Sequence, residues 1–447
     1  MPTEVIGTAS LPWGDIQGLI LRGYNYPKGR HFVLHFPDAA AGRKLVASLV
    51  PVITTAAPWG AKPASCLNIG FTADGLRALG FTVTTATKFP EEFVQGAIAR
   101  AKALVTSHNN LGDSGASGPE HWLLSLGIDG AAHAILSTWA LDDASREAGT
   151  AQVTALLADS GAQSLGFHDA DDLPDSFVHF GFRDSISQPK IDGAPIALTK
   201  KPGLDSQPPV ATGEFVTGYA NQAGPPLPVP ISPEFGANGS YSAFRILEQD
   251  VPAFFDYVGK QAKELGVPPS VIQANFCGRQ PDGTPLATHT GPEPSNDFDY
   301  SDDPNGNKCP LDSHIRRSHP RSSFDFGPPP NGEGYQHRIL RRALPYGPPW
   351  DPAHPDQDHT SRGLIGHFMG ASLAQQFEFV MTQWVNDNST IANNRSDALL
   401  GDNTPDGKLR MADGRTLNGF SRFTLTRGSA YLFFPSLTAL KTLTPAQ

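Results

Sequence analysis

The chain has 447 residues, of which 39% are hydrophobic and 17% charged, as is typical of a folded protein large enough to bury a cofactor. Its formal net charge of −10 argues against a nucleic acid or an anionic membrane surface as partner. The three cysteines, Cys66, Cys277 and Cys309, are too far apart in sequence for a CxxC zinc site and do not suggest a disulfide framework. No run of about 18 apolar residues predicts a membrane span. The first ten residues lack a basic and then apolar signal region, so we expect an intracellular protein, although a secreted mature form would look the same.

The first part of the chain alternates between short strands and helices. Period-2 and apolar runs predict strands over 31–36, 65–71, 121–128 and 177–182. Helices are predicted over 38–50, after the N-cap residue Asp38, and then from Thr72, over 90–104 and over 142–158. This β-α-β-α-β-α-β order with short strands favours an α+β unit with an antiparallel sheet.

A similar pattern follows a segment rich in proline and glycine. Residues 190–239 are predicted to be linker and loop. Strands are then expected over 240–247, 362–371 and 421–434, with helices over 250–265 and 372–385. We therefore predict two related α+β halves, residues 1–205 and 206–447.

The segment from 309 to 321 reads C-P-L-D-S-H-I-R-R-S-H-P-R and carries a candidate cofactor ligand. A neutral imidazole, here His314, is a good axial ligand for an iron porphyrin. The guanidiniums of Arg316, Arg317 and Arg321 are shaped to pair with carboxylates such as porphyrin propionates. The alternative is a surface loop with an incidental basic cluster.

Two further segments carry candidate catalytic groups. Residues 180–189 read F-G-F-R-D-S-I-S-Q-P, and Asp184 there could move a proton between the oxygens of a peroxide. The alternative is an aspartate that bonds its own backbone in a turn. Residues 338–347 read R-I-L-R-R-A-L-P-Y-G, and Arg341 could stabilise the charge of a leaving hydroxide. Its alternative is a solvated arginine on a strand edge.

These segments and four others resemble the dye-decolourising peroxidases, a family of haem peroxidases. The others read D-I-Q-G at 15–18, S-A-F-R-I-L-E-Q at 242–249, R-G-L-I-G-H-F at 362–368 and Q-Q-F-E-F-V-M-T-Q-W at 375–384. They occur in the family's order and span most of the chain. The resemblance implies two ferredoxin-like halves, with haem b lodged mainly in the C-terminal half.

The resemblance also assigns roles to individual residues. It implies that His314 is the proximal iron ligand, that Asp184 is the distal acid-base residue and that Arg341 is the distal arginine. Arg321 matches a propionate contact, and Asp397 matches the aspartate that orients the proximal imidazole. Haem contacts are also expected at Leu364 and Phe368.

The reaction implied by the resemblance uses hydrogen peroxide to oxidise dyes, phenols and similar donors. Large donors would be oxidised at surface aromatic residues, for which the candidates are Trp350, Trp384, Tyr335 and Tyr346. The sequence leaves open a monomer or a dimer. It also leaves two alternatives: a haem carrier or sensor without turnover, and another haem enzyme of a related fold, such as one that releases iron from haem.

Two positions depart from the family pattern. Ser185 stands where the family has a glycine after the distal aspartate, and Gly366 stands where a phenylalanine is common. The second change predicts a wider peroxide pocket. The alternative is that Phe368 or His367 turns inward and fills the gap, since residues two apart on a strand share a face.

Overall fold

The computed structural model describes residues 11–194, 209–288, 295–323, 336–353, 360–386, 395–403 and 406–444. Its central element is an eight-stranded antiparallel sheet in the order β10-β11-β9-β14-β2-β5-β1-β6. The strands are β1 (Lys28–His35), β2 (Ser65–Phe71), β5 (Ala134–Ala140), β6 (Gln163–Asp171), β9 (Ser240–Gln249), β10 (Leu340–Tyr346), β11 (Gly363–Gly370) and β14 (Thr424–Phe434).

The sheet consists of two blocks of four strands. In each block the second, third, first and fourth strands of the sequence lie side by side in that order, which is the ferredoxin-like arrangement. The blocks meet where β14 pairs with β2, and the end strands β6 and β10 contact each other. The predicted α+β fold with two ferredoxin-like halves is confirmed, whereas the boundary between residues 205 and 206 stays a prediction.

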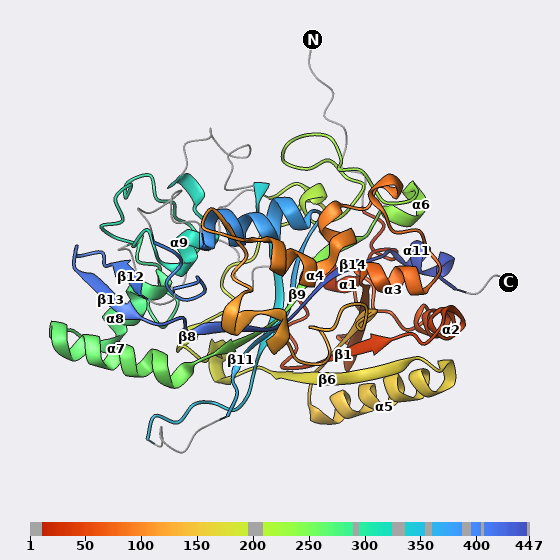
Figure 1. Cartoon of the computed structure of the whole chain (residues 1–447), viewed down its shortest axis with the longest axis horizontal. Helices are drawn as coiled ribbons and strands as arrows, with labels where there is room; N and C mark the ends of the chain where they lie inside the picture. The colour runs from red at the N-terminus through yellow and green to blue at the C-terminus, as the bar shows by residue number, and fades with distance from the viewer. Residues whose placement is uncertain are drawn as a thin grey trace, which may run out of the picture.

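Helices flank the sheet in both halves. In Figure 1, α2 and α5 of the first half lie to the right and α7 and α8 of the second half to the left. The longer helices are α2 (Ala39–Leu49), α3 (Ala73–Ala78), α4 (Glu91–Ala103), α5 (Asp143–Ser160), α7 (Val251–Leu265), α8 (Pro269–Cys277), α9 (His314–Ser318) and α11 (Leu437–Thr442). As predicted, the Asp38 side chain caps α2 by accepting a hydrogen bond from the Ala41 N–H at 2.8 Å. Within the described ranges, no helix is both long and apolar enough to cross a bilayer.

The predicted strand over 121–128 is wrong. This segment forms turns, with positive φ at Leu124 (55°) and Ser125 (61°), a conformation that a strand does not tolerate at two successive residues. Its apolar residues Trp122 and Leu126 are buried as single anchors of the turn. The apolar residues of 121–128 are therefore present because they are buried, and not because the segment pairs as a strand. The third strand of this half is β5.

Two other predictions need refinement. The strand expected over 177–182 is a small hairpin of β7 (Phe177–Val178) and β8 (Phe182–Arg183). The helical character predicted over 372–385 is confirmed, but it takes the form of two π-helical segments, η8 (Leu373–Glu378) and η9 (Val380–Val385). The unpredicted short strands are β3 (Val105–Thr106), β4 (Asn109–Asn110), β12 (Gly407–Arg410) and β13 (Thr416–Phe420).

A pair of histidines is buried between the two halves of the sheet. Ser137 Oγ lies 2.8 Å from both His31 Nδ1 and His367 Nε2, and His367 Nδ1 lies 3.2 Å from Ser242 Oγ. All four residues are fully buried. Burial lowers the pKa of His31 to about 3 and holds the pKa of His367 well below its usual value. Both imidazoles are therefore neutral at physiological pH.

Candidate active site

The histidine predicted to bind iron is held by a buried carboxylate. His314 opens α9, and its Nδ1 lies 2.8 Å from Oδ2 of Asp397, which is fully buried. The other carboxylate oxygen accepts the backbone N–H groups of Leu399 and Leu400, each at 2.9 Å. Because an ionised carboxylate only accepts, Nδ1 carries the ring proton and Nε2 keeps its lone pair.

Electrostatics around His314 favour this arrangement. Desolvation lowers the pKa of His314, but the charge and hydrogen bond of Asp397 outweigh it, and the net pKa is raised. Burial likewise acts to raise the pKa of Asp397, yet the charge of His314 and the two backbone N–H groups hold it below its usual value. The carboxylate thus stays ionised beside the imidazole.

The distal aspartate leaves the β7–β8 hairpin immediately after β8. The backbone N–H of Asp184 donates to the Ser176 carbonyl at 2.8 Å, and Ser185 follows with φ 61°, a conformation that glycine adopts more easily. The Asp184 carboxylate does not bond its own backbone. Its Oδ1 instead accepts from Nη2 of Arg341 at 3.3 Å, so the two predicted distal groups are brought together.

Gln188 ties the distal loop to the strand that carries Arg341. Its side-chain Nε2 donates to the Arg341 carbonyl at 3.1 Å, and its Oε1 accepts the Arg341 N–H at 3.2 Å. Nη2 of Arg341 also donates to the Ser187 carbonyl at 3.2 Å. Gln188 was missed from sequence because a glutamine in a loop usually faces solvent, although it lies only four residues after Asp184.

A second unpredicted residue, Asn296, joins the distal loop to the proximal segment. The side-chain Nδ2 of Asn296 donates to the Ile186 carbonyl at 2.7 Å, while the backbone carbonyl of Asn296 accepts from Nη1 of Arg321 at 3.0 Å. Nη1 of Arg321 also donates to the Phe298 carbonyl at 2.7 Å, and its guanidinium lies 3.9 Å from the Phe298 ring centroid. The propionate contact expected of Arg321 stays a prediction.

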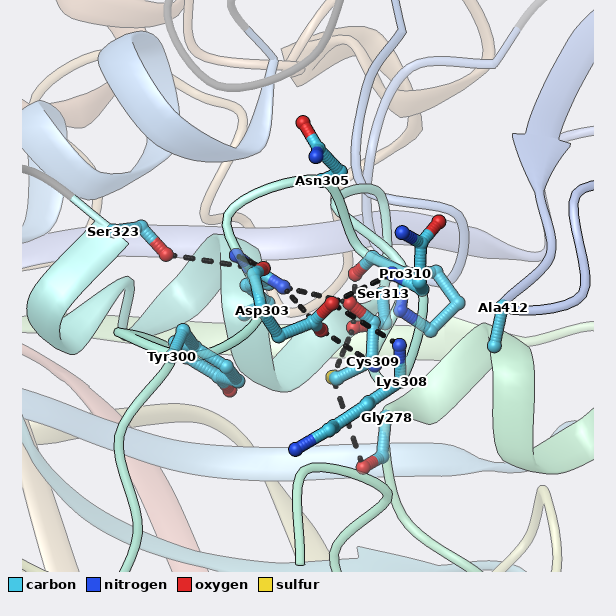
Figure 2. Close-up of polar contacts among 12 residues, drawn as sticks. Gly278, Tyr300, Asp303, Asn305, Lys308, Cys309, Pro310, Ser313, Ser323 and Ala412 are labelled. Atoms are coloured by element: carbon cyan, nitrogen blue, oxygen red, sulfur yellow. Dashed lines mark hydrogen bonds and ion pairs between the residues drawn. The ribbon is translucent and has the colours of Figure 1, made fainter.

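The neighbouring Arg316 stabilises the loop that precedes His314. It is fully buried, and its Nη1 donates to Asp303 Oδ2 at 3.0 Å and to the Cys309 carbonyl at 2.8 Å. Figure 2 shows the Asp303 side chain inside this loop, where it also accepts the backbone N–H groups of Lys308 at 3.1 Å and Cys309 at 2.9 Å. The Arg316 guanidinium is therefore engaged by the protein's own oxygens.

The strand pairing places the predicted apolar contacts beside the distal arginine. Phe368 on β11 is paired directly with Arg341 on β10, and Leu364 is on the same face of β11. His367 lies on the opposite face of β11, where it contacts Ser137 and forms the buried pair with His31.

The wider pocket expected from Gly366 has no basis in the structure. A Cβ at this position would lie 2.2 Å from the Arg342 carbonyl oxygen, so the backbone of β10 occupies the space that a side chain would need. Phe368 supplies the aromatic ring on this face, as the alternative reading allowed.

This set of side chains fits an iron porphyrin. Nε2 of His314 makes no hydrogen bond within the part of the chain that the structure describes, and its side chain is 31% exposed. The charges of both Arg341 and Asp184 act on the pKa of His314, so the distal pair lies near this imidazole. An imidazole with a free lone pair, an aspartate–arginine pair and the apolar side chains of Leu364 and Phe368 are groups that the binding of an iron porphyrin would use.

Two of the four aromatic residues named as candidates for surface oxidation are buried. Trp384 is 1% exposed and Tyr346 is 4% exposed. Trp350 is partly buried and stacks on Phe255 with ring centroids 4.7 Å apart. Tyr335 lies outside the described residues.

Comparison with known proteins gives a consistent result over the whole chain, although no protein-family model matches the sequence. The chain is 26% identical to Peroxidase 2 of Mycetinis scorodonius over 96% of its own length and 86% of the relative's. It is 28% identical to dye-decolorizing peroxidase AauDyP1 of Auricularia auricula-judae, covering 97% of this chain and 87% of that protein. Among solved structures, a dye-decolorizing peroxidase in complex with 2,6-dimethoxyphenol matches with a TM-score of 0.80 and 25% identity over 96% of this chain and 98% of that one.

Proposed function

Because the chain belongs to the dye-decolourising peroxidase family, we propose that its iron is held by His314 and that Asp184 and Arg341 carry the reaction with peroxide. The chain is a haem-dependent peroxidase that uses hydrogen peroxide to oxidise dyes and phenols. We further propose haem b as the form of the cofactor. The observation that carries these assignments is the pairing of Asp184 with Arg341 at 3.3 Å, near an imidazole held by Asp397 at 2.8 Å.

Bound haem would supply the iron at which peroxide is activated and would store the oxidising equivalents that O–O cleavage yields. The protein supplies the proton transfer. Oδ1 of Asp184 is engaged by Arg341, whereas Oδ2 has no hydrogen-bond partner in the described ranges. We assign Oδ2 as the atom that takes a proton from the incoming peroxide and returns it to the departing oxygen.

Arg341 has a second role in this scheme. Its guanidinium is permanently charged, so it stabilises the negative charge that develops on the departing oxygen without giving up a proton. Its hydrogen bonds to Asp184 and to the Ser187 carbonyl hold it at the same loop as the proton carrier. The two groups can therefore act on one bound peroxide.

The test uses the purified protein reconstituted with haem. The variant His314→Ala should retain little haem or give an altered Soret band, whereas His319→Ala, on the same segment, should bind haem normally. Mixing the wild type with hydrogen peroxide should give a new Soret spectrum that an added phenol returns to the starting one. Simple bleaching, as expected for a haem carrier, would contradict the peroxidase assignment.

A further inference from the structure

One tyrosine differs from the others in what its hydroxyl bonds. Among the tyrosines that the structure describes, only Tyr431 donates its hydroxyl to a carboxylate, Oε1 of Glu378, at 2.9 Å. The hydroxyls of Tyr24 and Tyr26 donate instead to an amide oxygen and a backbone carbonyl, neither of which is a base. The hydroxyl of Tyr241 has no hydrogen-bond partner.

The acceptor Glu378 is itself fixed in place. Arg100 donates to both of its carboxylate oxygens, from Nε at 2.8 Å and from Nη2 at 2.6 Å. Glu378 is 4% exposed and Tyr431 1% exposed, while the Arg100 side chain is 20% exposed. The hydroxyl of Tyr431 therefore faces a charged, oriented base in a site that excludes bulk water.

Strand register places Tyr431 on the same face of the sheet as the distal arginine. Arg341 is paired with Phe368, Phe368 with Ala243, and Ala243 with Tyr431. Directly paired residues share a face, and three strand spacings separate Arg341 from Tyr431 by about 14 Å. Tyr431 and the predicted distal arginine therefore lie in one row across the same face of the sheet.

Aromatic rings connect the two ends of this row. Ala243, which lies between Phe368 and Tyr431 in this row, has only a small side chain. The ring of Phe377 contacts the rings on either side of Ala243, with its centroid 5.9 Å from that of Phe368 and 6.1 Å from that of Tyr431. Ring contacts therefore run from Phe368 through Phe377 to Tyr431.

We propose that Tyr431 is a redox-active residue of this peroxidase, with Glu378 as its proton acceptor. This inference rests on the proposed function, because the peroxide-oxidised cofactor is the oxidant. One electron leaves Tyr431 and reduces that cofactor by one equivalent. At the same time the Tyr431 O–H bond breaks and an O–H bond forms at Glu378 Oε1, which leaves a neutral tyrosyl radical and a neutral carboxylic acid.

The protonation state of Tyr431 supports this coupling. Burial raises the pKa of Tyr431 well above its usual value, and the charge of Glu378 raises it further. The phenol of Tyr431 is therefore protonated at rest. Its oxidation requires less energy when a nearby base accepts the phenolic proton. After the transfer Arg100 stays charged beside a neutral Glu378, and solvent can stabilise this charge because the Arg100 side chain is 20% exposed.

The experiment is freeze-quench electron spin resonance of the haem-loaded enzyme after mixing with peroxide, in wild type and in Tyr431→Phe. Ring-deuterated tyrosine, incorporated during expression, separates tyrosyl from tryptophanyl signals by the narrowing it causes. We expect a tyrosyl signal in the wild type and at least a tenfold smaller one in Tyr431→Phe. The matched control is Tyr241→Phe, a buried tyrosine of the adjacent strand β9 without an acceptor, which should leave the signal unchanged.

A second variant tests the proton acceptor. Glu378→Gln keeps the shape and an accepting oxygen but cannot take the proton, so the tyrosyl signal should also fall several-fold although Tyr431 is present. A tyrosyl signal that persists in Tyr431→Phe, or is absent from the wild type while the Soret band still responds to peroxide, would overturn the inference and leave the peroxidase function standing. A Soret band that does not respond to peroxide would instead overturn the proposed function.

Discussion

The contact between His314 and Asp397 makes a quantitative prediction about haem affinity. In Asp397→Asn, the side-chain oxygen can still accept the N–H groups of Leu399 and Leu400, which leaves the amide nitrogen facing Nδ1 of His314. That nitrogen donates and cannot accept, so the imidazole must move its proton to Nε2 to remain neutral. The lone pair that binds iron is then lost in the favoured tautomer.

The expected cost follows from the interaction that is lost. A hydrogen bond to a charged group contributes about 1.5–3 kcal/mol, and loss of such a supporting partner typically weakens metal binding about 10- to 100-fold. We therefore expect the haem dissociation constant of Asp397→Asn to rise by about one to two orders of magnitude. The assay is haem transfer to an excess of apomyoglobin, followed at the Soret band.

Asp312→Asn is the matched control for the removal of a buried charge. Asp312 is also fully buried on the segment that carries His314, but its carboxylate accepts from Nε of Arg395 at 2.6 Å instead of from the imidazole. Equal haem affinity in wild type and a folded Asp397→Asn would refute the reasoning. An equal loss in both variants would mean that general destabilisation, and not imidazole orientation, sets the affinity.

Three further predictions concern the reaction with peroxide, the close strand contact and the buried histidines. Asp184→Asn should slow the Soret change with peroxide by about 10²- to 10⁴-fold in stopped flow, because the amide cannot accept the proton; an unchanged rate would exclude Asp184 as the carrier. Gly366→Ala should destabilise the fold by about 1–3 kcal/mol in urea unfolding, since its Cβ would meet the Arg342 carbonyl at 2.2 Å, whereas Gly259→Ala on α7 has open space around it and should not. The pKa of His31 falls from 6.5 unfolded to about 3 folded, so the unfolded state binds the extra proton and stability is lost as pH falls from about 6.5 toward 3. Between these two pH values, the free energy of unfolding should change with pH by about 1.4 kcal/mol per unit more in the wild type than in His31→Phe. Equal slopes in urea unfolding at several pH values would contradict the burial argument.

Local structure was predictable where the signal lies within a few residues. The helix caps Asp38 and Thr72 accept hydrogen bonds from backbone N–H groups three residues ahead, so their partners are close in sequence. The strand over 65–71 coincides with β2 because its apolar run is short and ends at a cap. By contrast, β6 was missed since its residues are largely exposed or half-buried and show little apolar alternation.

The site was only partly predictable because its contacts join distant parts of the chain. His314 and Asp397 are 83 residues apart, and Asp184 and Arg341 are 157 apart, so residue spacing alone could not pair them. The resemblance to a family supplied these four residues. Asn296 carries no such signal, and its connection of the distal loop to Arg321 emerges only from the folded loop geometry.

The distal pair depends on closure of the sheet, and this can be tested at Gln188. Asp184 comes from the first half and Arg341 from the second, and they meet because the end strands β6 and β10 contact each other. At this seam the two Gln188 hydrogen bonds to the Arg341 backbone contribute about 0.5–1.5 kcal/mol each.

Gln188→Ala should therefore slow the reaction with peroxide and increase amide hydrogen exchange over 184–189 in the haem-free protein. Haem affinity should be unchanged, because His314 and its partner both belong to the second half. Normal exchange over 184–189 together with a normal peroxide rate would show that Gln188 does not position the pair, and a loss of haem affinity would show that the two sides of the site are not separable in this way.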